Sequence, residues 1–436
     1  MLKFPALHLI HPRRVQHPAL ALTFLVCCLF GGYRILSLVS PARGEIVPPT
    51  TQPGNAGGGA GGGAGGGQRG PGVPEFYVRP GYRVDLVAQD IGETRFLEFD
   101  DHGNLFVSQP NKGDITLLHR QADGKYLPAG KLVTGKKSVH GMNFFRETGG
   151  GGILWFSQSD AIHKIKLKDD GTAEGDIITV LTNLPHGGHW WRSILATSDG
   201  FYTSVGDSGN ANEEVNSDRQ KIWKYDLDGK NRKLFASGIR NTEKLRFRPG
   251  TTEIWGTDHG SDNFGNSYGE ANGNQPITDL WPPDKVNHYV EGGFYGHPFL
   301  AGMRIPRPEY AHRPDILELA SKMIVPAWTL GAHWAPNAST FLAKDYFPGH
   351  KGDLLVALHG SWNSSIKVGY GIERICFDSE SGNPYGALRL VTCLSGPVEN
   401  ATVLARPCDV TEAPDGSVLF SDDAHGKIYR LSKVQP

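Results

Sequence analysis

Three side chains suited to acid–base and anion chemistry lie close together in the segment 186–210, HGGHWWRSILATSDGFYTSVGDSGN. His189 and Arg192 precede one apolar run, the turn 198–200 reverses the chain, and Asp207 follows a second apolar run. Two strands joined by a short turn that contains glycine form a hairpin, whose two ends return to one edge of a sheet. We therefore expect an imidazole, a guanidinium and a carboxylate on one rim.

Each of these side chains has a chemical role open to it. His189 is the residue type of a general base, and Asp207 is the type of acceptor that fixes the tautomer of a base. Arg192 suits an anionic or carbonyl-bearing ligand. His186, earlier in the same glycine-flanked turn, is a rival base. The segment is equally compatible with a structural interpretation, in which His189 packs in the rim, Arg192 forms an ion pair and Asp207 caps a turn.

Composition narrows the class of protein. The chain has 436 residues, of which 39% are hydrophobic, and its 44 Lys and Arg against 45 Asp and Glu leave a net charge of -1. No basic stripe or tail is present, so we expect no nucleic-acid partner. The 57 Gly and 29 Pro, with many strand-like runs and little helical periodicity, predict an all-β protein with many turns.

The five cysteines fall into two groups. Cys27 and Cys28 lie in an N-terminal apolar run, whereas Cys376, Cys393 and Cys408 lie near the C-terminus. The absence of a CxxC pair argues against a structural zinc site. If the compartment is oxidising, the sequence allows one disulfide among the last three cysteines.

Residues 1–44 resemble an export segment. Basic residues without an acidic one precede the charge-free run ALALTFLVCCLFGGY at 19–33. Continued to residue 40, the apolar stretch reaches about 22 residues, enough to span a bilayer, and we favour an uncleaved membrane anchor. The alternative is a signal peptide cleaved near Ser40-Pro41-Ala42. Both predict an extracytoplasmic (periplasmic or extracellular) protein.

Residues 45–74 are rich in glycine and proline, as in PPTTQPGNAGGGAGGGAGGGQRGPG. This composition has too few apolar groups to offset the entropy lost on ordering, and it predicts a flexible linker.

From residue 75 to 436 one pattern recurs: a turn, then a strand of apolar and β-branched residues, then a polar exit. The six copies are at 102–118, 151–167, 198–209, 250–262, 351–363 and 414–431. Their usual spacing of roughly 45–50 residues is the size of a four-stranded propeller blade. The sequence therefore predicts a six-bladed β-propeller. A long excursion is expected at about 260–350, a first blade starting at 82–87, and ring closure by 428–431.

The exits of the six copies place polar residues where blades of a propeller converge. These residues are Gln109, Gln158, Asp207, His259, His359 and Asp422. They predict a common funnel near the axis. The alternative is that they satisfy backbone groups of their own turns.

Five motifs in order resemble the soluble glucose dehydrogenase and L-sorbosone dehydrogenase family, which consists of six-bladed propellers that use pyrroloquinoline quinone (PQQ) and calcium. The motifs are GGHWWR with a hairpin to GDSGN, ASGIRNTEKLRFRPGTTEIWGTDHGSD, PPDKVNHYVEGGFYGHP, GDLLVALHGSWN with GYGIERICF, and RPCDVTEAPDGSVLFSDDAHGKIYRL. The resemblance covers residues 75 to 434.

This resemblance implies roles for individual residues. His189 would take the proton of the substrate hydroxyl, and Asp207 would orient His189. Arg240 and Asn241 would contact the quinone carbonyls, with Arg240 stabilising the negative charge that develops there. The other implied cofactor contacts are Arg192, His259, His359, Asn363, Lys367 and Arg406. Gly260 and Ser261 match positions whose main-chain carbonyls bind Ca²⁺, a cation that prefers oxygen ligands.

The resulting hypothesis is a PQQ-dependent dehydrogenase that oxidises an aldose, sorbosone or a related sugar hydroxyl or aldehyde hydrate by hydride transfer to the quinone. Because the sequence has no CxxCH haem motif, the electrons would pass to a separate acceptor. Two alternatives remain: a calcium-dependent hydrolase of the lactonase type, and a non-enzymatic extracellular binding propeller.

Overall fold

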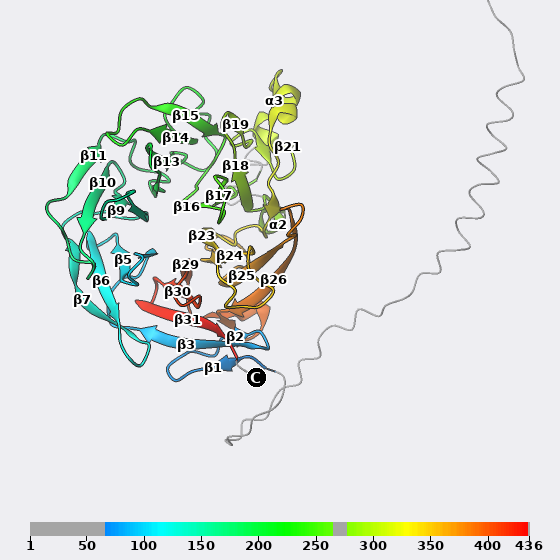
Figure 1. Cartoon of the computed structure of the whole chain (residues 1–436). Helices are drawn as coiled ribbons and strands as arrows, with labels where there is room; N and C mark the ends of the chain where they lie inside the picture. The colour runs from blue at the N-terminus through cyan, green and yellow to red at the C-terminus, as the bar shows by residue number, and fades with distance from the viewer. Residues whose placement is uncertain (1–65, 265–276, 435–436) are drawn as a thin grey trace, which may run out of the picture. The chain divides into compact units, whose positions relative to one another are not determined.

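The computed structural model describes residues 66–264 and 277–434, and within them six antiparallel sheets surround a central axis (Figure 1). The apolar runs that recur in the sequence form the second strand of each sheet. Every residue of these strands is buried, because each blade packs between two neighbours and both of its faces are covered. The prediction of an all-β, six-bladed propeller is confirmed.

The first three blades follow one another along the chain, named here from the axis outward. The first contains β4 (Leu97–Phe99), β5 (Leu105–Gln109), β6 (Asp114–Arg120) and β7 (Tyr126–Val133). The second contains β8 (Met142–Arg146), β9 (Gly152–Ser157), β10 (Ile162–Leu167) and β11 (Ile178–Leu181). The third contains β12 (Leu195–Ala196), β13 (Phe201–Val205), β14 (Lys221–Tyr225) and β15 (Lys233–Ser237), with β19 (Gly293–Phe294) added in parallel at its edge.

The remaining blades include strands from distant parts of the chain. The fourth contains β16 (Leu245–Phe247), β17 (Ile254–Asp258), β18 (Lys285–Tyr289) and β22 (Trp328–Thr329). The fifth contains β23 (Pro336–Phe341), β24 (Leu354–Leu358), β25 (Gly371–Phe377), β26 (Pro384–Thr392) and β2 (Tyr77–Val78). The sixth contains β29 (Pro407–Glu412), β30 (Val418–Asp422), β31 (Lys427–Lys433), β3 (Tyr82–Ala88) and β1 (Gln68–Arg69).

The ring closes where β3 pairs with β31, in a register that joins Tyr82 to Lys433. The expectation that residues 82–87 start the first blade is therefore wrong: they complete the sixth, and the first blade starts at Leu97. Closure beside β31 is as expected. Gln68 and Arg69, in the segment assigned to the linker, form β1 and pair in parallel with β3.

The expected excursion at 260–350 is less irregular than the sequence suggested, because β18, β22 and β23 within it are blade strands. Before and between them lie further short elements, of which α3 and β21 are labelled in the upper part of Figure 1. These are α2 (Ile277–Leu280), β20 (Leu300–Ala301), β21 (Ile305–Pro306), the 3-10 helix η2 (Pro308–Tyr310) and α3 (Ile316–Lys322). After the fifth blade come β27 (Leu394–Ser395), η3 (Val398–Asn400) and β28 (Thr402–Val403).

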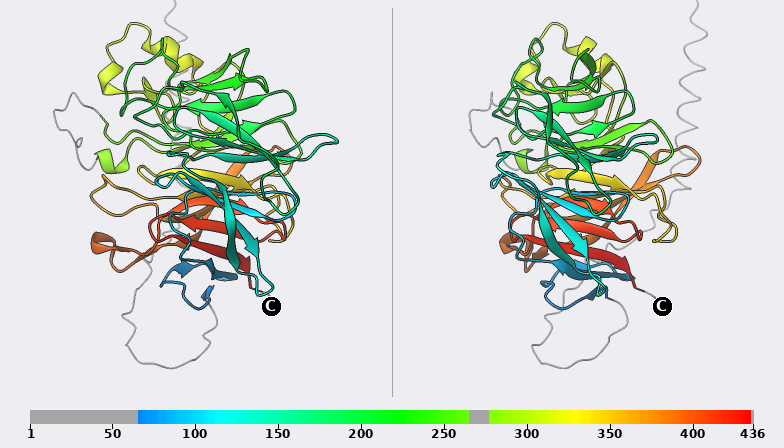
Figure 2. Two further views of the ribbon diagram at one scale, coloured as in Figure 1. Left: turned by 90° about the vertical axis from the view of Figure 1, so that its left-hand side faces the viewer. Right: turned by 60° about the vertical axis from the view of Figure 1, so that its left-hand side comes forward.

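Hydroxyl groups of the second strands tie neighbouring blades together. In four blades this hydroxyl donates to a main-chain carbonyl at the start of the next blade. Figure 2 shows the sheets of these blades from the side. The pairs are Ser157 to Arg192 at 2.8 Å, Ser204 to Thr242 at 2.6 Å, Thr257 to Pro336 at 2.5 Å and Ser421 to Arg95 at 2.8 Å. Each bond satisfies a buried carbonyl that the short inner strands leave free.

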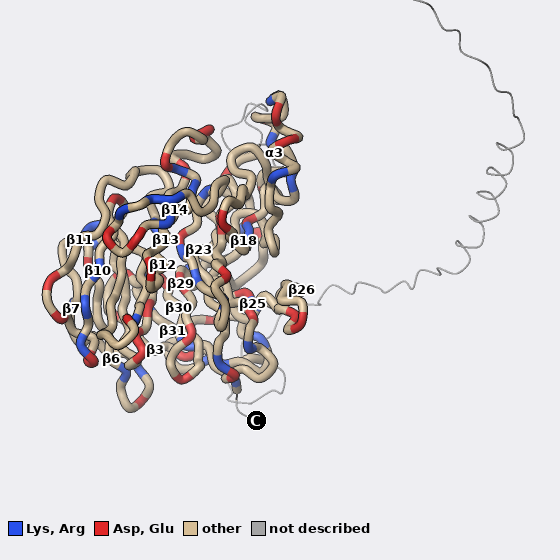
Figure 3. The backbone as a smooth tube through the Cα atoms, turned by 45° about the horizontal axis from the view of Figure 1, so that its top comes forward, with Lys and Arg blue, Asp and Glu red and all other residues tan. Residues whose placement is uncertain are grey.

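Ion pairs cross the axis between blades that are far apart in sequence. Lys244, just before β16, places its Nζ 2.7 and 2.5 Å from the two carboxylate oxygens of Asp409 on β29. Two residues further along, Arg246 binds Glu98 of β4. Both members of the Lys244–Asp409 pair are buried, so each charge depends on the other for stabilisation. Along the backbone, basic and acidic positions are interspersed (Figure 3).

Three other sequence expectations concern the termini and cysteines. The anchor or signal segment, residues 1–44, lies outside the described residues. None of the helices that the structure describes is long and apolar enough to cross a bilayer. Cys376, Cys393 and Cys408 are buried free thiols, so the disulfide left open by the sequence is not formed among them.

The axial pair gives a stability prediction. Lys244→Met leaves the Asp409 charge buried without its cation and should lower the free energy of unfolding by about 3–5 kcal/mol, measured by urea denaturation. Adding Asp409→Asn should recover part of the loss. Lys224→Met, which breaks an exposed pair with Asp199, should cost less than about 1 kcal/mol. Equal losses from the two lysine variants would contradict this role for the axis.

Candidate functional site

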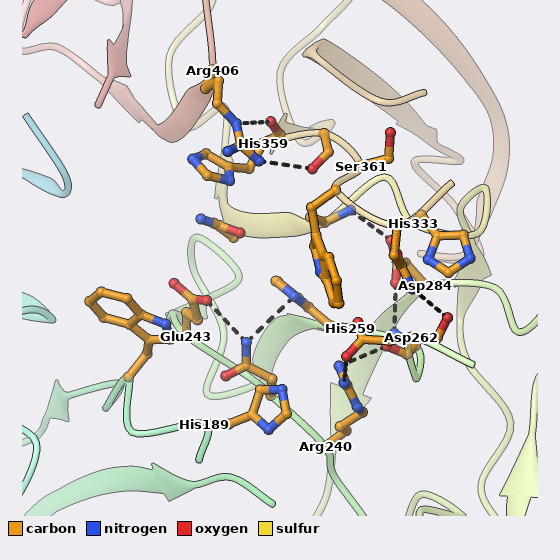
Figure 4. A pocket seen from close by; sticks show the side chains of 18 of the residues that line it. His189, Arg240, Glu243, His259, Asp262, Asp284, His333, His359, Ser361 and Arg406 are labelled. Carbon is orange, nitrogen blue, oxygen red and sulfur yellow. Dashed lines mark hydrogen bonds and ion pairs between the residues drawn. The ribbon is translucent and has the colours of Figure 1, made fainter. Parts of the chain in front are cut away.

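A cavity of about 370 Å³ opens at one end of the propeller axis (Figure 4). Its walls are the loops that precede inner strands and those that follow second strands. Of the residues that the sequence singled out, eight line it together: His189, Arg240, Asn241, His259, Gly260, His359, Asn363 and Arg406. In Figure 4 His189 and Arg240 lie across the cavity from Arg406 and His359.

His189 is held as a neutral base. Its Nδ1 lies 3.1 Å from the main-chain carbonyl of Asp207, which only accepts, so Nδ1 carries the proton and Nε2 keeps its lone pair. Burial, reinforced by the Arg240 cation, lowers the pKa of His189 to about 3. The imidazole is therefore neutral throughout the physiological range. His186, the rival base, is exposed and is not among the residues that line the cavity.

Asp207 orients His189 through its carbonyl, whereas the sequence analysis assigned that task to its carboxylate. The carboxylate instead locks the following loop, accepting from Gly209 N at 2.7 Å, Asn212 N at 3.0 Å, Gln220 Nε2 at 2.8 Å and His297 Nε2 at 2.6 Å. Burial opposes its ionisation, but these donors, His297 first, hold the pKa of Asp207 well below its usual range. The expectation of a side-chain contact between Asp207 and His189 is thus corrected.

Arg240 is fixed by two loops. Its Nε and Nη2 donate to the main-chain and side-chain oxygens of Asn210, at 2.8 and 3.0 Å. Nη1 donates to the carbonyl of Gly260 at 2.8 Å, and Nη2 pairs with Asp262 at 2.9 Å. A guanidinium held at this many points cannot change rotamer without breaking several bonds.

Asp258, which the sequence analysis missed, sets the main chain under this arginine. Its Oδ1 accepts from the backbone N–H groups of Arg240 and Asn241, at 2.9 and 2.8 Å. Lys285 neutralises it at 2.7 Å. Asp258 ends the second strand of its blade, and Asp422 does the same in the sixth blade by accepting from Arg406 N at 3.0 Å.

The guanidinium of Arg406 is held by two main-chain carbonyls. Its Nε donates to the carbonyl of His359 at 3.2 Å, and its Nη2 donates to the carbonyl of Gly360 at 3.1 Å. Its guanidinium carbon lies 5.7 Å from the ring centroid of Tyr370. Nε2 of His359 in turn pairs with Asp423 at 2.9 Å. Within the described part of the chain no carboxylate pairs with the Arg406 guanidinium, so Arg406 presents its positive charge to the cavity.

Two predicted cofactor contacts are placed differently from expectation. Arg192 is 0% exposed and donates to the carbonyls of His189 and Pro185, so it braces the loop and does not reach the cavity. Lys367 is exposed at a separate hollow. The chain is drawn away there because Asp279 binds Ser364 and Ser365.

The side chain of Ser261 also turns away from the cavity. Its hydroxyl donates to the carbonyl of Asn263 at 2.8 Å and accepts from Arg307. The metal contact expected of Ser261 is made by its main-chain carbonyl, and neither of these bonds involves that carbonyl. Asp284 lies below the same loop and accepts from Gly260 N at 2.6 Å and Ala335 N at 2.8 Å. Burial raises the pKa of Asp284 to about 7.

The exits of the six repeats do not share one function. His259 and His359 line the cavity, and Asp207 and Asp422 hold loops beside it. Gln109 donates to the carbonyls of Ile91 and Glu93, and Gln158 donates to Lys137, as in the alternative that exit residues satisfy turn backbone.

Sequence reasoning also missed a charged network on the cavity floor. Arg95 pairs with Glu243 at 2.9 Å and Asp423 at 2.8 Å, and its guanidinium lies 4.0 Å from the ring centroid of Trp191. Burial opposes ionisation of Glu243, but Arg95 and then His140 hold its pKa well below its usual range. In the sequence, this network could have been found only from the charged residues that lie immediately before a predicted strand.

Several polar atoms in the cavity have no protein partner. Within residues 66–264 and 277–434, the buried side-chain oxygens of Asn241 and Asn363 accept no hydrogen bond. Buried oxygens of this kind are costly unless a ligand or water satisfies them. Among the same residues, no group of three or more His, Cys, Asp or Glu side chains is arranged to hold a metal ion.

The state of His189 gives a testable prediction. Since its folded pKa is about 3, a nitrogen-15 NMR titration should show a neutral ring protonated at Nδ1 down to about pH 4, with protonation only below that. His189→Gln identifies the signal. Titration near pH 6.5, or a proton on Nε2, would contradict the geometry.

Comparisons with known proteins agree with this fold. A protein of Borreliella burgdorferi described as uncharacterized is 28% identical over 367 residues, covering 80% of this chain and 89% of that protein. The holo form of the PQQ domain of pyranose dehydrogenase from Coprinopsis cinerea superposes with a TM-score of 0.70 at 21% identity, covering 84% of this chain and 100% of that one.

Two further solved structures share the architecture. The iodide structure of carbohydrate-active enzyme family AA12 from Trichoderma reesei has a TM-score of 0.70 at 19% identity, covering 83% of this chain and 98% of that one. The PQQ-bound aldose sugar dehydrogenase of Streptomyces coelicolor has a TM-score of 0.52 at 15% identity, covering 80% and 98%. The structural relatives are thus the quinoprotein propellers that the five motifs indicated. Residues 76–304 and 318–434 match the model described as TrAA12-like, and the chain belongs to this family.

Proposed function

We propose that this protein is a PQQ-dependent oxidoreductase that oxidises a sugar hydroxyl or aldehyde hydrate, of the aldose or sorbosone type. The observation that carries the proposal is the neutral imidazole of His189, fixed with Nε2 free, in the same cavity as Arg240 and Arg406. A neutral imidazole can accept the hydroxyl proton of the substrate. The fixed cations beside it can stabilise the negative charge that develops on the group that accepts the electrons.

The residues of the cavity fit the cofactor. PQQ is a planar polyanion with carbonyl oxygens and carboxylates, and Arg406 offers a planar donor group for a carboxylate. Arg240 would bind one of its carbonyl oxygens. The unpartnered side-chain oxygens of Asn241 and Asn363 only accept, so they would meet the ring N–H of the cofactor or water rather than its oxygens. Ca²⁺ would take the carbonyls of Gly260 and Ser261; the Gly260 oxygen, which already accepts from Arg240 Nη1, has a second lone pair for the metal. The carboxyl groups of Asp262 and Asp284 line the same cavity.

When bound, the quinone would supply the acceptor for the two electrons and one proton that leave the substrate carbon as hydride. Nε2 of His189 takes the hydroxyl proton, and the carbonyl of Asp207 stabilises the imidazolium through Nδ1–H. Arg240, already held by Asn210 and Gly260, needs no reorganisation to face developing negative charge. The reduced site would then pass its electrons to a separate acceptor.

One experiment separates this proposal from the two alternatives. The purified domain is incubated with PQQ and Ca²⁺ and tested for dye reduction with aldoses and aldehydes, and for lactone hydrolysis with Ca²⁺ alone. Quinone-dependent dye reduction supports the oxidoreductase. Hydrolysis without quinone indicates a lactonase, and neither activity indicates a binding propeller.

The base assignment predicts a loss of turnover. His189→Gln should lower kcat by about a hundredfold or more, because the hydroxyl proton has no acceptor, while PQQ affinity stays within about twofold. Steady-state kinetics and quinone titration measure the two effects. The matched control is His186→Gln, on the exposed turn, which should retain activity. The reverse pattern would assign the base to His186.

The cofactor assignment predicts a loss of affinity. Arg406→Ala removes a charge-assisted hydrogen bond and should weaken PQQ binding by about 1.5–3 kcal/mol, measured by calorimetry on the apo-protein. Lys367→Ala, outside the cavity, should leave binding unchanged. If only the lysine variant loses affinity, the quinone lies elsewhere.

A further inference from the structure

The two stretches that match the family model leave residues 305–317 outside the match. This segment, called the strap here, contains β21, η2 and the first residues of α3. It is fastened to the propeller at Phe299, whose carbonyl accepts from Arg307 N at 2.9 Å. The ring of Phe299 packs edge-on against Tyr310, with centroids 5.0 Å apart.

One contact of the strap reaches the loop assigned to calcium. Arg307 is 2% exposed, and its Nη1 donates to the hydroxyl of Ser261 at 2.5 Å. Its Nη2 donates to the carbonyl of Asn263 at 3.0 Å and pairs with Glu309 at 2.7 Å. The guanidinium carbon lies 5.3 Å from the ring centroid of Phe264. Arg307, which is not among the residues that line the cavity, therefore holds this loop at Ser261 and Asn263.

A second set of contacts reaches the loop that follows Asp207. The hydroxyl of Tyr310 donates to the carbonyl of Ala211 at 2.8 Å, and Arg313 pairs with Glu213 at 2.6 Å. The Tyr310 bond is partly buried, whereas the Arg313 pair is exposed and contributes little by itself.

The two loops held by the strap are the same two loops that hold Arg240. Asn210 supplies two of its acceptors from one loop, and Gly260 and Asp262 supply the others from the second. The loops also meet directly, because Asp262 N donates to the side-chain oxygen of Asn210 at 2.7 Å. A change at Arg307 is thus transmitted to Arg240 and to the carbonyl of Gly260 within a few bonds.

The chemistry of Arg307 argues for positioning rather than for stability alone. A buried arginine costs several kcal/mol of desolvation, and an apolar side chain of similar volume is often as stable at such a site. A planar fork, however, fixes two oxygens of one loop in relation to each other, which an apolar side chain does not do.

We propose that the strap, through Arg307, sets the calcium-binding conformation of residues 260–263 and thereby the position of Arg240. Arg307 is a positioning residue that acts through Ser261 and Asn263. The inference rests on the proposed function, because it assigns the strap to the same metal and quinone site.

The test compares Arg307→Met, Arg307→Lys and wild type by calorimetric titration of Ca²⁺ in the presence of PQQ. Loss of a group that supports metal ligands typically weakens metal binding by about 10- to 100-fold, and Arg307→Met should show a loss of that size. Arg307→Lys, which keeps the charge and part of the hydrogen bonding, should recover part of it. Hydrogen exchange of the apo-protein should rise at residues 260–264 in Arg307→Met, independently of any ligand.

The matched control is Arg304→Met. Arg304 belongs to the same excursion but donates to the carbonyl of Met323, away from both loops, so this variant should bind Ca²⁺ as wild type does. If Arg307→Met does not fold, Tyr310→Phe removes only the bond to Ala211 and should raise exchange at residues 208–212.

The outcomes separate this inference from the proposed function. Wild type that binds neither Ca²⁺ nor PQQ refutes the proposed function and, with it, the assignment of the strap to the metal site. Wild type that binds both, with Arg307→Met of unchanged affinity and unchanged exchange, overturns the role of the strap alone. Equal weakening by Arg304→Met would also overturn it, because the effect would then be general to the excursion.

Discussion

The cations on the propeller axis are stable only because blades far apart in the sequence supply carboxylates to face them. Arg95 lies just before the first blade, yet its partners Glu243 and Asp423 lie just before the fourth blade and just after the second strand of the sixth. An unpaired charge at this depth would cost several kcal/mol. The blades must therefore close into a ring before these charges are compensated. The same network lines the cavity, so the charges that require the ring to close also make the site polar.

Main-chain atoms hold most of the reactive side chains, which makes the site rigid before any ligand binds. A main-chain carbonyl fixes the tautomer of His189, and main-chain carbonyls accept hydrogen bonds from Arg406. The carboxylate of Asp258 accepts from the backbone N–H of Arg240 and so fixes its main chain. Fixed dipoles of this kind stabilise developing charge without reorganising. Their cost in buried polar groups is offset by the hydrogen bonds within each loop, such as those of the Asp207 carboxylate.

The sequence predicts the blades better than it predicts the site. Second strands are buried on both faces, so they appear as continuous apolar runs that recur at the period of a blade. Inner strands such as β12 and β16 have two and three residues, too few to leave a pattern, and β3 looks like a beginning because closure joins the two ends of the chain. The location of the cavity was still predictable, because polar residues gather where the recurrent strands end.

Individual contacts are harder to predict, for physical reasons. Residue type indicates that Asp207 lies beside His189, but it does not say whether the carboxylate or the carbonyl makes the bond. Arg192 has the chemistry of a ligand-binding arginine, yet the loop folds back over it. The pair Arg95–Glu243 joins residues 148 positions apart, and no local spacing encodes such a contact.

Closure through β3 and β31 makes the sixth blade different from the other five. Its strands come from both ends of the propeller, and only hydrogen bonds and packing join them. During synthesis β3 leaves the ribosome long before its partner exists, so the ring closes last and through a contact of very long sequence separation, which slows folding. A tension applied at the N-terminal end of the propeller would act in turn on β1, on β2 at the edge of the fifth blade, and on β3. The ring itself would open only when β3 leaves β31, which makes this pairing the mechanical weak point of the closure.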